Sequence, residues 1–439
     1  MSSNFSSAKA IPIPEKVDFV AQRSAPLWQC GLVFAFGFAL EFNPTIGLGG
    51  QAAASGNLFG FRVIDVISFG AVCLLGIYSL VPKRILPLAF YALIIGILFA
   101  APILSTDPQT SILAYRYMLY SLAALYVLVV VDEVAALEWF CWGLIIGLIA
   151  TVPIFIVQDS VYASKLVEWG LTPPYANVAF TGSGGDFLRY SGLTGHPNEA
   201  GHVAALSAAA GAYFLIARRR LLPIAIVSAG LLVIFYYARS RGGLFAGGAI
   251  VSLSLIVAQG RINLIRFVVV LSIVGIVLVL ISQLDFIASR FGNDQDQSTN
   301  ISERLGSMLA AVHVILTNPL GLPLDEFSES VASESGGMPT PHNGFLFFGG
   351  VFGLLPLLVL LVAFGVSLRV RDETDVFFAF FALQVGLSFL FEQLPGTCSY
   401  EFAICLLIGH TYLKTGFGTD FRAGFSHRAF QRSLTRATH

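Results

Sequence analysis

The sequence predicts an all-α, polytopic integral membrane protein with about twelve transmembrane helices and a long outer loop that contains a short amphipathic helix. Composition is the first reason. Of the 439 residues, 56 % are hydrophobic and only 12 % are charged, and the mean hydropathy is +0.78. A typical soluble domain has about 25 % charged residues. So few charges cannot cover a water-soluble surface, which excludes a soluble globular enzyme.

The second reason is a series of apolar segments, since a helix needs roughly 20 apolar residues to cross the hydrocarbon core. In chain order, the predicted spans are 27–42, 61–81, 85–104, 111–131, 136–157, 197–217, 221–238, 243–258, 264–283, 343–367, 376–394 and 401–413. They divide the chain into a cytoplasmic tail (1–26), five helices (27–157), a first outer loop (158–196), helices six to nine (197–283), a second outer loop (284–342), helices ten to twelve (343–413) and a basic cytoplasmic tail (414–439).

Lysine and arginine give the orientation, because they are enriched in cytoplasmic loops. If the N-terminus is cytoplasmic, most of the 25 basic residues fall on the cytoplasmic side. Both termini are then cytoplasmic, and the two long loops face outward. A cleavable signal peptide is the competing interpretation of the first span, because residues 52–55 resemble a cleavage site, but Glu41 and Pro44 interrupt its apolar run.

The second outer loop contains a segment with the pattern of an amphipathic helix. Asn300 is placed to cap this helix, and Glu303 stands where a capping-box acid belongs. One apolar arc is formed by Ile301, Leu305, Met308, Leu309, Val312, Ile315 and Leu316. The Asn-Pro pair at 318–319 ends the helix, which we expect to lie against the membrane surface or the helical bundle. Arg304, at the edge of the arc, is then at the depth of lipid phosphates.

Residues 239–243, with the sequence Arg-Ser-Arg-Gly-Gly, place two arginines in a very short outward loop, against the positive-inside bias. The glycines allow the backbone to approach a ligand or a neighbouring helix closely. A helix N-terminus favours an anion, and the planar guanidinium of Arg241 binds phosphate oxygens bidentately. The motif predicts a phosphate site; the alternative is an anchor for lipid headgroups.

Arg116 lies inside the fourth span, where ionisable residues are rare and are functional candidates. Tyrosines flank it, and its alternative role is to extend its long side chain to the outer interface. Asp65 in the second span is a candidate partner for Arg116 or for nearby Arg62, and the sequence leaves both pairings open.

Histidine supplies the candidate base. His342 lies in the run Pro-His-Asn-Gly that closes the second outer loop, and a histidine side chain there suits removal of a proton from a hydroxyl group. Its alternative role is to cap a helix. His196 and His202 are six residues apart and face different sides of a helix, so they form no metal pair and are expected to be structural.

Other kinds of chemistry find little support in the sequence. Asp294, Gln295 and Asp296 match the D-x-D pattern of metal-dependent glycosyltransferases, but three residues in a polar stretch indicate a solvated loop. The five cysteines are scattered and form no disulfide framework. The sequence has no P-loop, HExxH, G-x-S-x-G or Rossmann glycine pattern, and no charge block that indicates nucleic-acid binding. No metal or cofactor is expected.

Four segments together resemble the superfamily of O-antigen ligases and Wzy-type polysaccharide polymerases. The segments are 189–198 with its Pro-Asn, Ser240-Arg241-Gly242-Gly243, the loop helix with Arg304 leading to Asn318-Pro319-Leu320-Gly321, and Pro341-His342-Asn343. They occur in the family's order between about residues 189 and 367, and the twelve-span layout also matches. The chain departs from the family pattern at Gly321-Leu322-Pro323 and at Gly195-His196-Pro197-Asn198.

The resemblance implies a metal-independent glycosyltransferase of surface-polysaccharide biosynthesis, either of lipopolysaccharide or of exopolysaccharide. It would act at the periplasmic face of the bacterial inner membrane, which makes the two outer loops periplasmic. The donor would be a glycan on undecaprenyl pyrophosphate, and the acceptor a hydroxyl of another glycan or of lipid A-core. His342 matches the base that activates the acceptor, and Arg241, Arg304 and Arg189 match arginines of the donor site. The intramembrane charge of Arg116 adds it to this set, with Asn343, Ser240 and Asn198 as supporting residues.

The motifs do not separate a polymerase, which joins repeats on the lipid carrier, from a ligase, which moves the finished chain to an acceptor. Two other function classes remain open: a polytopic glycolipid transporter or flippase, and a non-catalytic component of a polysaccharide-assembly complex. The charged residues that are selected as functional candidates cluster at one face of the membrane rather than in a central cavity. This distribution favours chemistry at the surface over transport.

Overall fold

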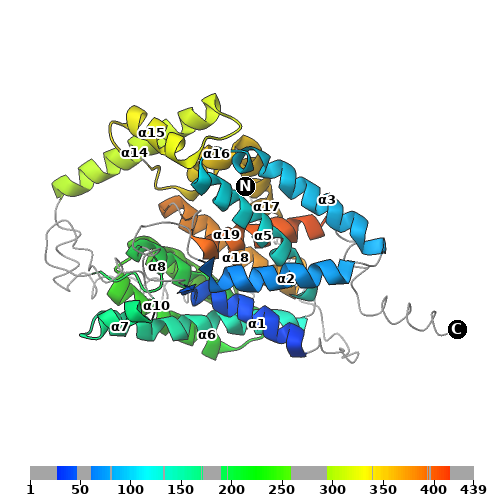
Figure 1. The fold of residues 1–439 in the computed structure, drawn as a ribbon. Helices are drawn as coiled ribbons and strands as arrows, with labels where there is room; N and C mark the ends of the chain where they lie inside the picture. The colour runs from blue at the N-terminus through cyan, green and yellow to red at the C-terminus, as the bar shows by residue number, and fades with distance from the viewer. Residues whose placement is uncertain are drawn as a thin grey trace, which may run out of the picture.

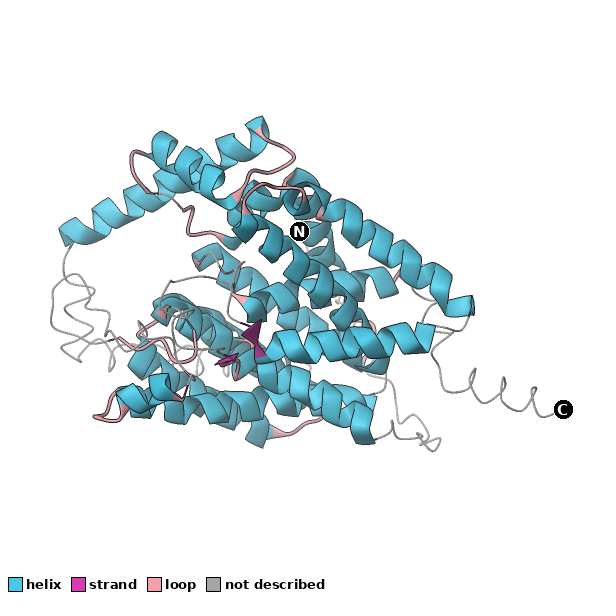
Figure 2. Cartoon of the chain, in the orientation of Figure 1, coloured by secondary structure: helices cyan, strands magenta, loops and turns pink. Residues whose placement is uncertain are grey.

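The structure is a computed structural model that describes residues 27–46, 61–79, 82–131, 134–169, 171, 189–194, 196–258, 294–338, 340–392, 394 and 397–415. These residues form a helical bundle with one antiparallel pair of two-residue strands, β1 (Thr45–Ile46) and β2 (Phe61–Arg62) (Figures 1 and 2). The predicted all-α class is confirmed. The predicted ninth span, 264–283, lies outside the described residues.

Five stretches of helix in the described part of the chain are long and apolar enough to cross a membrane. They are α5 (Pro108–Val131), α6 (Val134–Gln158), the consecutive α8 (Pro197–Ala205) and α9 (Ser207–Ile216), α10 (Leu221–Ala238) and α18 (Glu373–Phe391). Shorter apolar helices are α1 (Leu27–Glu41), α2 (Val63–Ser79), α3 (Pro82–Leu98), α11 (Arg241–Val257) and α17 (Leu354–Ser367). The other described helices are α4 (Ala100–Ile103), α7 (Ala163–Glu168), α14 (Asp294–Thr317), α15 (Leu324–Ser335), α16 (Gly344–Phe352) and α19 (Cys398–Leu413). Length and composition thus support a membrane protein.

Glycines allow α1 and α6 to pack backbone against backbone. A side chain at Gly37 of α1 would place its Cβ 2.2 Å from the Phe140 carbonyl oxygen. A side chain at Gly143 of α6 would place its Cβ 2.2 Å from the Phe34 carbonyl oxygen, and Gly147 extends the contact by one turn. Small residues four apart let membrane helices approach closely, and the Thr151 hydroxyl of α6 also donates to the Glu41 carbonyl of α1 at 3.2 Å.

The predicted tenth span, 343–367, is not one helix. It is divided at Gly353, which has φ +96°, into α16 and α17. The segment that follows α14 packs against the break, because Leu354 N–H donates to the Pro319 carbonyl at 2.8 Å and Leu322 N–H donates to the Gly350 carbonyl at 2.9 Å. A Cβ at Gly353 would lie 2.7 Å from the Leu320 carbonyl carbon, so tertiary contacts impose the break.

The helix of the second loop differs from its prediction in two ways. First, α14 begins at Asp294, so Asn300 lies inside the helix instead of capping it, and the predicted solvated loop at Asp294-Gln295-Asp296 is wrong. Second, much of the apolar arc is exposed, including Leu305, Leu309, Val312 and Leu316. The buried face consists of Ser307, Ala310, Ala311, Val314 and Ile315, so Ile315 of the predicted arc does pack on the bundle. Figure 1 shows α14 and α15 together along one edge of the bundle.

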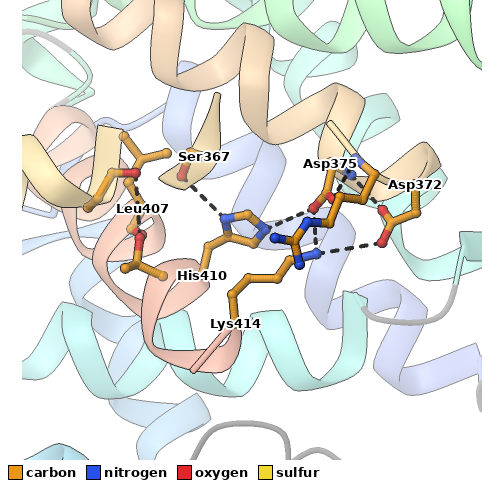
Figure 3. Close-up of polar contacts among 9 residues, drawn as sticks. Ser367, Asp372, Asp375, Leu407, His410 and Lys414 are labelled. Carbon is orange, nitrogen blue, oxygen red and sulfur yellow. Dashed lines mark hydrogen bonds and ion pairs between the residues drawn. The ribbon is translucent and has the colours of Figure 1, made fainter. Parts of the chain in front are cut away.

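A buried polar cluster lies at the end of the bundle where α18 begins (Figure 3). Asp375 Oδ1 pairs with Lys414 Nζ at 2.6 Å and with His410 Nε2 at 3.4 Å, and the side chains of Asp375 and His410 are each 1 % exposed. The other ring nitrogen of His410, Nδ1, lies 3.2 Å from Ser367 Oγ. The His410 ring stacks on Phe378 with centroids 4.0 Å apart. The cluster therefore ties together the ends of α17, α18 and α19.

We expect Asp375→Asn to lower the free energy of unfolding by about 3 kcal/mol, because it leaves the charge of Lys414 without its buried partner. Thermal unfolding of the purified protein in detergent measures this loss. Asp372→Asn is the matched control, since Asp372 also reaches Lys414, at 3.5 Å, but its side chain is 56 % exposed. An exposed pair contributes about 0–1 kcal/mol. An Asp375→Asn variant as stable as the control would contradict the role of the cluster.

Candidate functional site

The candidate site lies at the opposite end of α18, where a continuous chain of polar contacts connects Arg189, Asn198, Glu392 and His342. The Arg189 guanidinium donates to Asn198 Oδ1 at 2.6 Å, and Asn198 Nδ2 donates to Glu392 Oε2 at 2.8 Å. The other oxygen of Glu392, Oε1, lies 3.1 Å from His342 Nδ1. The structure thus brings together three of the residues that the sequence selects, through one that it does not.

Helix caps position the predicted residues. Asn343 caps α16 by accepting the Leu346 N–H at 3.1 Å, which fixes the backbone beside His342. His342 itself has φ +41°, a backbone conformation that is uncommon outside glycine. Ser240 caps α11 by accepting the Gly243 N–H at 3.3 Å. Asn343 and Ser240 therefore support the site through the backbone.

Asn198 is the hub of the site. Besides its two side-chain bonds, its carbonyl accepts the Ser240 hydroxyl at 3.2 Å, and its N–H donates to His196 Nδ1 at 3.2 Å. The bond from Ser240 fixes the start of α11 against the start of α8. Arg241, the first residue of α11, is thereby held next to the polar chain.

The backbones of α8 and α11 are in close contact at Gly201 and Gly243. A Cβ on Gly243 would lie 2.4 Å from the Gly201 carbonyl carbon, and a Cβ on Gly201 would lie 2.4 Å from Ser240 Cβ. Arg304 of α14 is near enough to Arg241 for their positive charges to repel each other. Arg241 begins α11, so it lies at a helix N-terminus, where a helix favours anions.

Glu392 is the residue that sequence reasoning missed. It directly follows the candidate membrane helix α18, and it is 7 % exposed. Burial raises the pKa of its carboxyl, but the hydrogen bonds from His342 and Asn198 and the charge of His342 outweigh burial and bring the pKa down to about 2. An ionised carboxylate therefore holds the His342 ring. A lone acid at the end of an apolar span was the available signal, by the same rule that selected Arg116.

Arg116 belongs to a different polar cluster. Its guanidinium lies 3.6 Å from Asp65 Oδ2, and the two side chains are 11 % and 6 % exposed. The Arg62 backbone N–H also donates to this carboxylate, at 2.7 Å, and the Tyr120 hydroxyl donates to its other oxygen. Asp65 therefore contacts both candidates: it forms an ion pair with the Arg116 side chain and accepts a hydrogen bond from the Arg62 backbone.

The Arg62 side chain links this second cluster to the candidate site. Its guanidinium donates to the carbonyls of Asn43 and Leu193, each at 3.1 Å. Leu193 belongs to the same loop as Arg189, so the Arg116 cluster is connected to that loop through Arg62. The structure gives Arg116 an ion pair that joins α5 to α2.

The two histidines next to the site, His196 and His202, have different surroundings. Burial lowers the pKa of His196; the Glu392 carboxylate opposes this shift, and the charges of Arg189 and His342 add to it. A neutral His196 can accept the Asn198 N–H and cap α8. His202 is 1 % exposed and lies 3.0 Å from Ser388 Oγ through Nδ1. The expectation that these two histidines serve structure agrees with these contacts.

In chemical terms, the site combines an imidazole held by a carboxylate with guanidinium groups on three separate segments. The imidazole can take a proton from a substrate hydroxyl. The guanidinium groups of Arg189, Arg241 and Arg304 can stabilise negative charge that develops on a phosphate. No group of three or more His, Cys, Asp or Glu side chains in the described part of the chain is arranged to hold a metal ion.

A scan against protein-family models finds no family that matches this chain, and a search of curated proteins finds no match.

Proposed function

We propose that this chain is a membrane glycosyltransferase that moves a glycan from undecaprenyl pyrophosphate to an acceptor hydroxyl. The reaction would be that of an O-antigen ligase or of a polysaccharide polymerase. One observation carries the proposal: His342 is hydrogen-bonded to an ionised Glu392 in the same polar chain that holds Arg189 and the start of α11 with Arg241. A base and an anion-binding group are what such a transfer requires.

In the proposed reaction, the acceptor oxygen attacks the anomeric carbon of the donor sugar. A new C–O bond forms, the bond from that carbon to the phosphate oxygen breaks, and undecaprenyl pyrophosphate leaves with the bonding electrons. His342 takes the proton of the acceptor hydroxyl, and Glu392 stabilises the resulting imidazolium. The guanidinium groups of Arg241, Arg304 and Arg189 stabilise the negative charge on the leaving pyrophosphate without a metal ion.

We infer a topology of twelve spans with both termini in the cytoplasm of a bacterium, in its inner membrane. Asp375 and Glu392 lie at opposite ends of α18, so the cluster around Lys414 and the site around His342 are at opposite ends of the bundle. By the positive-inside rule, Lys414 and the basic sequence that follows it favour a cytoplasmic position for this cluster. The site is then periplasmic, where the lipid-linked glycan of surface-polysaccharide synthesis is presented.

We expect Glu392→Gln to lower kcat for transfer by about 100-fold, because the amide keeps the size of the side chain but loses the charge that holds the His342 ring. Initial rates with purified protein measure the effect. Glu373→Gln is the matched control at the other end of α18, where Glu373 pairs with Arg218 at 3.2 Å and is 53 % exposed. If both variants keep the wild-type rate, Glu392 has no part in catalysis.

The lipid-linked glycan that accumulates in cells lacking this chain tests the function. Single repeats that wild-type protein clears, and His342→Ala does not, identify a polymerase. Long lipid-linked chains together with unoccupied acceptor identify a ligase. Absence of any periplasmic lipid-linked glycan contradicts the transferase and favours the alternative, a glycolipid transporter.

A further inference from the structure

A second layer of hydrogen bonds lies directly beneath the candidate site. Asn198 and His202 are one turn apart on α8; Ser388 lies in the last turn of α18, four residues before Glu392, which directly follows the helix. Residues four apart share one face of a helix, so Asn198 and His202 lie on one face of α8, and their contacts with Glu392 and Ser388 form two rungs between α8 and the end of α18. The first rung is the bond from Asn198 to Glu392, and the second is the contact of 3.0 Å between His202 Nδ1 and Ser388 Oγ.

The second rung is firmly held on the α18 side. Ser388 Oγ also accepts the Tyr400 hydroxyl at 2.8 Å and the Gln384 amide at 3.1 Å, and all of these side chains are buried. Tyr400 lies 2.8 Å from the His202 carbonyl as well, which ties α19 to α8. His202 therefore contacts α18 at Ser388, whose side chain is held by two further hydrogen bonds.

The other edge of the His202 ring contacts α11. A Cβ on Gly242 would lie 2.7 Å from His202 Nε2, so the ring fills the space beneath the residue that follows Arg241. Gly242 is also close to Phe391 Cβ, which would lie 3.2 Å from the same Cβ. One imidazole thus contacts both the helix that begins with Arg241 and the helix that Glu392 directly follows.

From this geometry we propose that His202 is a positioning residue, which sets the separation between the anion-binding start of α11 and the Glu392–His342 pair. The proposal rests on the proposed function, because it assigns His202 a role in that reaction. His202 is 1 % exposed and acts through Ser388 and Gly242 rather than on substrate. Loss of the second rung shifts Glu392 and His342 relative to the bound pyrophosphate, and a shift of that kind lowers the rate of the chemical step.

Two substitutions separate the hydrogen bond from the volume of the ring. His202→Phe keeps a ring against Gly242 and removes the bond to Ser388, whereas His202→Asn keeps a polar atom near the position of Nδ1. We expect kcat to fall by about 10- to 100-fold in His202→Phe and to recover at least in part in His202→Asn, with little change in donor KM. Ser388→Ala reproduces the loss, and the double variant His202→Phe, Ser388→Ala is no slower than either single variant.

A matched pair exists at the other end of the bundle. His410 is also 1 % exposed and also contacts a buried serine, Ser367, at 3.2 Å. His410→Phe is therefore expected to lower Tm while kcat, measured below the unfolding transition, stays within about twofold of wild type. This control shows what loss of a buried histidine does to stability alone.

The experiment measures initial rates and Tm of each full-length variant in nanodiscs. The donor is the lipid-linked oligosaccharide isolated from cells that lack this chain. Slower His202→Phe with recovery in His202→Asn supports the proposal. A His202→Phe variant with the kcat of an active wild type overturns it and leaves the proposed function standing, as does a loss that His410→Phe shares equally. No transfer by wild-type protein contradicts the proposed function itself, and with it the role of His202.

Discussion

His342→Ala is expected to reduce glycan transfer by about 10²- to 10⁴-fold, the usual contribution of a positioned general base. The variant removes the imidazole that takes the acceptor proton in the proposed reaction and that lies 3.1 Å from the Glu392 carboxylate. Its side chain is 25 % exposed, so truncation leaves no large cavity and the fold is expected to persist.

Unchanged Tm and membrane insertion are the controls for His342→Ala, and release of the lipid carrier is the readout. His313→Ala provides a second comparison, because His313 also contacts a glutamate, Glu334 at 2.8 Å, but is 64 % exposed on α14. Near-normal transfer by His342→Ala would remove the proposed base.

Arg241→Lys is expected to reduce transfer by about 10- to 100-fold, although the charge is kept. An ammonium is a point donor and cannot bind two phosphate oxygens with the fork of a guanidinium. Arg241 begins α11 at a helix N-terminus and lies close to Arg304, so the position already favours an anion. The lost geometry, rather than lost charge, then sets the size of the effect.

Arg220→Lys is the matched control for Arg241→Lys. Arg220 directly precedes α10 at the end away from Arg239, is 56 % exposed, and reaches Glu138 only at 3.9 Å. Lysine there is expected to leave transfer within about twofold of wild type. Equal rates for Arg241→Lys and wild type would show that Arg241 makes no bidentate contact with the donor.

The long apolar helices could be predicted from the sequence because their signal is local. An uninterrupted apolar run determines α6 or α10 whatever surrounds it. The break at Gly353 could not be predicted in this way. It depends on the hydrogen bonds from Leu354 to Pro319 and from Leu322 to Gly350, and on the packing of Leu320. Proximity of residues 319–322 to this glycine is a property of the tertiary structure.

The sequence after α14 carries the signals of a helix, α15, that the sequence analysis does not predict. α15 has Asp325 and Glu326 in its first turn, buries Phe327 and Val331 one turn apart, and ends at Gly336 with φ +81°. These are ordinary helix start, face and stop signals. The polar composition of the segment hid them.

The sequence selects individual residues of the candidate site but does not show the contacts between them. Arg189, Asn198 and His342 were selected one by one, but the sequence does not show that Glu392 joins them, since it lies far from each along the chain. The pairing of Asp65 was open for the same reason, and the structure gives it contacts with both Arg116 and the Arg62 backbone. Such contacts depend on how α2, α5, α8 and α18 pack.

The most direct test of the central claim is release of undecaprenyl pyrophosphate by purified protein in nanodiscs with a chelator present. We expect wild-type protein to release the carrier only when donor glycan and acceptor are both supplied, and we expect His342→Ala to bind the donor but release almost none. Equal release by wild type and His342→Ala, or no release by wild-type protein that has bound the donor, would contradict it.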